Sequence, residues 1–114
     1  MDDNIILVDA EAGSKRVMLN FKLYAKLLGK FLDDPAYINL NNALTAGDME
    51  KAQSSIHALK GLSANLSLIE LNNQSIKLEA QIKAGSVDPE LVEYLKNIYA
   101  QTKIEIEKVI TRYV

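Results

Sequence analysis

A histidine, a lysine and a glycine within little more than one helical turn are the residues whose types and spacing point most clearly to chemistry. His57 is the only histidine of the chain, and Lys60 and Gly61 follow it closely. The pKa of an unperturbed imidazole is about 6.5, so a neutral ring nitrogen is available as a nucleophile near neutral pH. On a helix, an ammonium group three residues further along lies beside the ring and can stabilise the charge of a transferring phosphoryl group.

The helical phase of this segment predicts that His57 faces solvent. At 100° per residue, the ring lies roughly 130° from the mean direction of the apolar stripe. Its face also carries Gln53, Lys60, Gly61 and Ala64. A glycine inside a helix costs about 1 kcal/mol relative to alanine, and here it leaves a bare surface beside the ring. Such a surface suits the close approach of a folded partner. Position alone leaves the ordinary alternative open, a surface histidine beside a solvated lysine.

The elements that must position these residues all read as helices. Asp34-Pro35 and Asp88-Pro89 have the form of helix starts, while Gly47 and Gly85 have the form of helix ends. Ser67 and Glu70 have the spacing of a capping box. Apolar residues recur in steps of three and four, as the core-facing side of a helix requires. The predicted helices span residues 10–17, 21–33, 35–46, 48–66, 68–84 and 89–112.

Short connections between these helices favour antiparallel packing of neighbours. The expected fold class is therefore all-α: an up-and-down four-helix bundle with a short extra N-terminal helix. A chain of 114 residues has the size of one domain. We expect a single domain over residues 1–114, with the bundle core at about 20–113.

Composition narrows the function classes. The net charge is −2 and the pI is about 5.4, so no broad basic surface for nucleic acid is implied. Cysteine is absent, which excludes disulfides and thiolate sites. No apolar run is long enough to span a membrane, and the acidic start, residues 1–4, is unlike a secretory signal. We expect a cytoplasmic monomer that binds neither nucleic acid nor membrane.

Two kinds of site are disfavoured by the motifs. One histidine without Glu-x-x-His pairs cannot build the usual carboxylate metal site of a helical bundle. The chain also has no glycine-rich nucleotide loop, so we expect neither ATP binding nor autokinase activity. The remaining alternatives are a phosphoryl carrier and an interaction-only bundle that docks a partner without carrying phosphate.

The segment around the histidine strongly resembles the histidine-containing phosphotransfer (HPt) family. The matching stretch is His57-Ala58-Leu59-Lys60-Gly61-Leu62-Ser63-Ala64-Asn65-Leu66. The resemblance continues in Leu23-Tyr24, in the turn Ala46-Gly47-Asp48 and in the pair Leu78-Glu79, and it covers the chain from about residue 9 to the C-terminus. Two stretches depart from the family pattern, which commonly has glycine there: Ser67 and Met18-Leu19.

The resemblance implies a role for each matching residue. His57 is expected to accept the phosphoryl group through Nε2, and Lys60 to assist the transfer electrostatically. Glu79 falls where family members place a group that accepts a hydrogen bond from Nδ1–H; its alternative is an ordinary helical glutamate. The docking face is expected to include Gln53, Gly61 and Ala64, with helix 21–33 at its flank.

The resemblance also implies the partners. These are response-regulator receiver domains, a hybrid histidine kinase, or both, with the phosphoryl group passing between receiver aspartates by way of His57. No cofactor is expected on this chain, and Mg²⁺ is expected on the receiver. Lys77 and Lys83 are candidates for steering an acidic partner, although ordinary solvated lysines are the safer interpretation. The sequence does not identify the receivers, the signal or the direction of phosphoryl flow.

Overall fold

The computed structural model describes residues 5–18 and 20–113, and within them it contains helices and no strand. The prediction of an all-α fold is confirmed, and the predicted helix ends agree with the structure to within two residues. The helices are α1 (Ala10–Lys15), α2 (Phe21–Leu32), α3 (Ala36–Ala46), α4 (Met49–Asn65), α5 (Ile69–Ala84) and α6 (Pro89–Tyr113).

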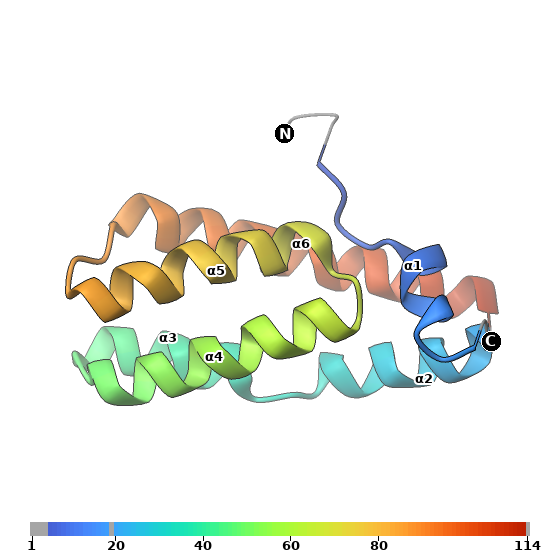
Figure 1. The fold of residues 1–114 in the computed structure, drawn as a ribbon, viewed down its shortest axis with the longest axis horizontal. Helices are drawn as coiled ribbons and strands as arrows, with labels where there is room; N and C mark the ends of the chain where they lie inside the picture. The colour runs from blue at the N-terminus through green and yellow to red at the C-terminus, as the bar shows by residue number, and fades with distance from the viewer. Residues whose placement is uncertain (1–4, 19, 114) are drawn as a thin grey trace.

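The helices form a bundle of four rods with α1 at one end (Figure 1). Three rods are single helices, α4, α5 and α6. The fourth consists of α2 and α3, which follow one another along the same direction instead of folding back. The four-helix bundle with an extra N-terminal helix is thus confirmed, but antiparallel packing does not hold for this pair of neighbours. Accordingly, α3 packs mainly on α4, whereas α2 packs mainly on α6.

The break between α2 and α3 has a local cause. Pro35 has no backbone N–H to donate and restricts the residue before it, so the helix cannot run through. The Asp34 carboxylate accepts a hydrogen bond from the Ala36 backbone N–H at 2.8 Å, which starts α3. The chain therefore changes helix without reversing direction. The core between the rods is apolar, and its largest fully buried side chains include Tyr24, Leu28, Leu40, Ile56, Leu59, Leu71, Leu78, Leu95, Ile98 and Ile106.

The turn between α4 and α5 differs from the prediction. Ser67 does not cap α5 as part of a capping box, because it adopts a left-handed backbone with φ 56° and ends α4 instead. The Glu70 carboxylate accepts hydrogen bonds from Gln74 and Tyr94. Met18 has a similar φ of 58°. At Ser67 and Met18, where the family commonly has glycine, the backbone is thus in the region that glycine favours; Leu19 lies outside the described residues.

The N-terminal segment holds this turn. The Asp9 backbone N–H donates to the Ser67 carbonyl at 2.9 Å, and the Glu70 N–H donates to the Ile6 carbonyl at 3.0 Å. The Tyr24 hydroxyl donates to the Leu66 carbonyl at 2.6 Å. Burial, aided by the nearby Asp9 carboxylate, raises the pKa of Tyr24 to about 12. The backbone groups of the turn therefore find partners in the first part of the chain.

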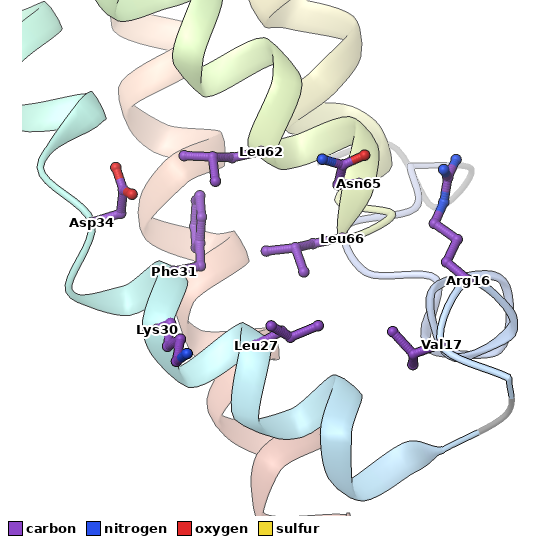
Figure 2. Close-up of a pocket in the computed structure, with 9 residues that line it drawn as sticks. All are labelled: Arg16, Val17, Leu27, Lys30, Phe31, Asp34, Leu62, Asn65 and Leu66. Carbon is purple, nitrogen blue, oxygen red and sulfur yellow. The ribbon is translucent and has the colours of Figure 1, made fainter.

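A groove of about 640 Å³ opens between α2, the end of α4 and the residues after α1 (Figure 2). Its floor is apolar, formed by Leu27, Phe31, Leu62 and Leu66 together with Val17. Arg16, Lys30, Asp34 and Asn65 add charged and polar groups to its lining. This groove lies on α4 beyond the turn that carries the histidine.

Candidate functional site

His57 lies in the middle of α4 with 73% of its side chain exposed. The outward direction expected from the helical phase is therefore present in the structure. Gln53, Gly61 and Ala64 are also exposed. The four residues are spaced by three or four along the helix, so they form one continuous surface strip of α4. The structure brings the expected docking residues together around the imidazole.

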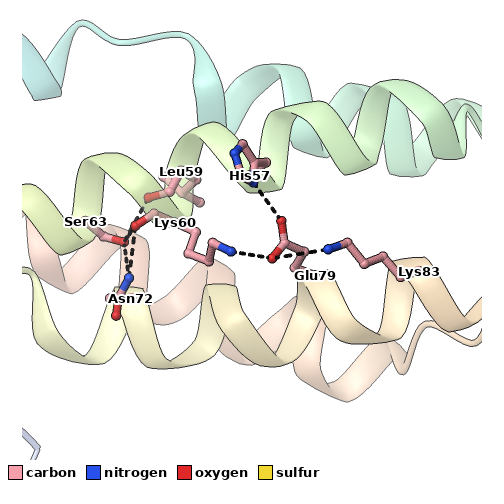
Figure 3. Close-up of polar contacts among 7 residues, drawn as sticks. All are labelled: His57, Leu59, Lys60, Ser63, Asn72, Glu79 and Lys83. Carbon is pink, nitrogen blue, oxygen red and sulfur yellow. Dashed lines mark hydrogen bonds and ion pairs between the residues drawn. The ribbon is translucent and has the colours of Figure 1, made fainter.

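Glu79 reaches the imidazole from the neighbouring helix α5 (Figure 3). Its Oε2 lies 3.1 Å from His57 Nδ1, and its side chain is only 7% exposed. An ionised carboxylate can only accept a hydrogen bond, so this contact requires the proton to be on Nδ1. In the neutral ring, Nε2 then carries the free lone pair. Because Nε2 is on the opposite side of the ring from Nδ1, the arrangement presents a nucleophilic nitrogen away from Glu79.

Two lysines share the other oxygen of the same carboxylate. Lys60 Nζ donates to Glu79 Oε1 at 2.6 Å, and Lys83 Nζ lies 4.0 Å from that oxygen. The hydrogen bond from Lys60 is the largest cause that lowers the pKa of Glu79; burial opposes it, while the hydrogen bond to His57 and the charges of both lysines add to it. Glu79 thus stays ionised near neutral pH and gathers three groups at one point (Figure 3).

The position of Lys60 refines the expectation from the sequence. Its ammonium is held by Glu79 and is 32% exposed, so it is not simply a solvated lysine beside the ring. Lys83 is 56% exposed and lies on the other side of the carboxylate. Both ammonium groups are one carboxylate away from the imidazole. Two positive charges therefore lie next to the carboxylate that contacts the ring.

Among residues 5–18 and 20–113, no packing contact explains Gly61. A Cβ built at this position would meet nothing within 4 Å, apart from the backbone of its own helix. By contrast, a Cβ at Gly13 would collide with the ring of Tyr24, so that glycine is needed for the contact between α1 and α2. The helix therefore carries an unfavourable residue at Gly61, and no contact in the described part of the chain explains it.

A hollow of about 530 Å³ adjoins the imidazole on the side towards the start of α4. It is lined by His57, Glu79 and Lys83 and by residues of the first half of α4: Glu50, Gln53 and Ser54. From the sequence, Lys83 was only a candidate for steering an acidic partner, and Glu50 was not predicted at all. For Lys83 a signal existed, because a lysine four residues after a glutamate lies beside it on a helix. Lys77 is exposed, and no ion pair to it is seen among the described residues.

Within residues 5–18 and 20–113, no three side chains from histidine, cysteine, aspartate and glutamate gather as a metal site would require. No helix in this part of the chain has the length and apolar character needed to cross a membrane.

Comparison with known proteins agrees with the geometry. The family model described as "Hpt domain" matches residues 37–105, which is more than half of the chain and includes α4 and α5 with His57, Lys60 and Glu79. No curated protein and no solved structure matches the chain significantly. Hpt domains act in histidine phosphotransfer within phosphorelays, as carriers rather than enzymes. The chain belongs to the Hpt domain family.

Proposed function

We propose that this protein carries a phosphoryl group on Nε2 of His57 between aspartates of response-regulator receiver domains. The observation that supports this most is the contact between His57 Nδ1 and the buried carboxylate of Glu79, with the ring itself exposed. It favours the tautomer whose Nε2 is a free nucleophile. His57 is also the only histidine in the sequence.

The phosphoryl transfer needs no reagent other than the phosphorylated receiver. The Nε2 lone pair attacks the phosphorus of a receiver's aspartyl phosphate, so an N–P bond forms while the bond from phosphorus to the carboxylate oxygen breaks. The aspartate leaves as a carboxylate, and the ring, still protonated on Nδ1, becomes cationic. Glu79 stabilises that positive charge, as the carboxylate partner of a histidine does in a catalytic triad. The reverse reaction passes the group to a second aspartate.

Lys60 and Lys83 supply positive charge for the phosphoryl oxygens. The ammonium of Lys60 is 2.6 Å from Glu79 Oε1 and that of Lys83 is 4.0 Å from it. Transfer of a phosphoryl group depends mostly on position and on electrostatic stabilisation, and a second cation adds to the first. The Mg²⁺ of the reaction belongs to the receiver in this proposal, as the family resemblance implies.

The surface on which the receiver docks is the exposed strip of α4 formed by Gln53, His57, Gly61 and Ala64, and it continues into the groove beside α2. Gly61 lets the receiver backbone approach the helix, since no side chain stands there. Beyond it, Leu27 and Leu62 offer apolar area for a receiver's apolar side chains. We also propose that the protein is a cytoplasmic monomer and that its partners are receivers or a hybrid histidine kinase.

The decisive experiment separates a carrier from an interaction-only bundle. The protein is incubated with individual phosphorylated receiver domains, and acid-labile label is sought on this chain. The matched control is His57→Gln, which removes the only imidazole and keeps a polar side chain. A carrier is labelled only when His57 is present. Labelling of the variant to the same extent would show that His57 is not the acceptor and would overturn the proposal. Labelling of neither protein by any receiver, despite binding, would overturn it in favour of the interaction-only bundle.

A further inference from the structure

We propose that Asn72 is a positioning residue that fixes the axial register of α5 against α4, and thereby keeps Glu79 at the imidazole of His57. This inference rests on the proposed function of His57. Asn72 does not touch the imidazole in any contact seen in the structure. Its Nδ2 donates to the backbone carbonyl of Lys60 at 2.9 Å and contacts Ser63 Oγ at 3.3 Å (Figure 3).

The spacing along α5 connects Asn72 with Glu79. The two residues are seven apart, which is about 20° short of two full turns and about 10.5 Å along the axis. Both therefore point from α5 towards α4. One makes the contact near the turn between the helices, and the other makes the contact beside His57. Two points of attachment along an axis determine how far one helix can slide past the other.

Both attachments meet at Lys60. A helical side chain leans towards the N-terminus of its helix, whereas its carbonyl points towards the C-terminus. The ammonium of Lys60 thus reaches back to Glu79 Oε1 at 2.6 Å, while its carbonyl receives Asn72. The Ser63 hydroxyl donates to the same carbonyl at 3.0 Å and to the Leu59 carbonyl at 2.8 Å. Ser63 is fully buried, so this polar cluster is set into the interface between the helices.

The consequence for the site is geometric. A helix pair packed only through apolar side chains tolerates small axial shifts, because dispersion contacts are not directional. The hydrogen bond between His57 Nδ1 and Glu79 Oε2 spans 3.1 Å, so a displacement of Glu79 by about 1 Å along the line that joins the two atoms would break it, and a displacement across that line would misalign it. Asn72 supplies a directional bond that opposes such a shift.

The test compares Asn72→Ala with Asn73→Ala. Asn73 is the exposed neighbour on the same helix, so both variants gain the same helix propensity. The readout is the ratio of the Nδ1–H to the Nε2–H tautomer of His57, measured by ¹⁵N NMR at about pH 8. We expect Asn72→Ala to lower this ratio at least about threefold, while Asn73→Ala leaves it unchanged.

Two more variants keep the test sharp. Ser63→Ala removes the hydroxyl but keeps the bond from Asn72 to the Lys60 carbonyl, so it should change the ratio less than Asn72→Ala does. If Asn72→Ala does not fold, the tautomer ratio is measured in Asn72→Ser instead. An unchanged ratio in the folded Asn72 variant would overturn the positioning role. Because the tautomer is measured without any receiver, this result does not depend on phosphotransfer, whose failure in the wild-type protein would instead overturn the proposed function.

Discussion

The glycine beside the histidine permits a prediction in which stability and function change in opposite directions. Gly61→Ala adds a Cβ that would meet nothing within 4 Å outside the backbone of its own helix, so it costs no packing energy. Replacing a glycine inside a helix by alanine stabilises the helix by about 1 kcal/mol. For a domain of this size, that gain corresponds to a rise in Tm of about 4 °C. The measurements are thermal unfolding by circular dichroism and urea denaturation.

Phosphotransfer should respond in the other direction, because the added atoms stand where the receiver approaches. Gly61→Gln places a long side chain on the docking surface. Overpacking of a close interface costs about 1–3 kcal/mol, which corresponds to a transfer rate lower by roughly 5- to 150-fold. Gly61→Ala should slow transfer less than Gly61→Gln. The rates are measured as single-turnover loss of label from a phosphorylated receiver.

Gly29→Ala is the matched control. Gly29 also lies inside a helix, α2, and a Cβ there would make only an ordinary contact of 3.9 Å with Ile110. This variant should gain similar stability without slowing transfer. Equal transfer rates for Gly61→Gln and the wild-type protein would refute the clearance role of Gly61. A loss of stability in Gly61→Ala would refute the structural argument.

Three further predictions concern the carboxylate and the N-terminal end of the bundle. Folding lowers the pKa of Glu79 below its ordinary value of 4.5, so the stabilising contribution of the carboxylate is present above pH 4.5 and is lost as the pH falls through the lowered value. Urea denaturation at several pH values should therefore show that the stability difference between the wild-type protein and Glu79→Gln shrinks at acid pH. A difference that stays constant with pH would contradict this. Gly13→Ala should lower the free energy of unfolding by about 1–3 kcal/mol because its Cβ would collide with Tyr24, and unchanged urea denaturation would contradict the contact between α1 and α2. Ser67→Gly should raise it by roughly 1 kcal/mol because φ is 56° there, and a lower urea midpoint would show that the serine side chain matters more than backbone strain.

Much of the fold could be predicted because its signals are local. Aspartate and proline at helix starts, and Gly47 and Gly85 at helix ends, predicted the boundaries, and both glycines indeed have positive φ. The serine between α4 and α5 was misread, because a capping box and a left-handed turn share the same polar residue types. The predicted antiparallel direction of α3 relative to α2 was also wrong, because loop length alone does not determine whether a chain reverses.

The site divides in a similar way. The exposure of His57 follows from helical phase, which requires no knowledge of neighbouring helices. The contact with Glu79 came from family resemblance, because a distance between two helices depends on their register. The role of Asn72 depends on that same register, and nothing in the spacing of one helix specifies it. Sequence reasoning therefore identified the nucleophile more readily than the groups that orient it.

One labelling measurement decides whether His57 carries the phosphoryl group. The wild-type protein is incubated with a radiolabelled phosphorylated receiver, and the label on this chain is followed with time, before and after acid treatment. We expect an acid-labile label on the wild-type protein and none on His57→Gln. An acid-stable label, or an equal label on His57→Gln, would contradict it.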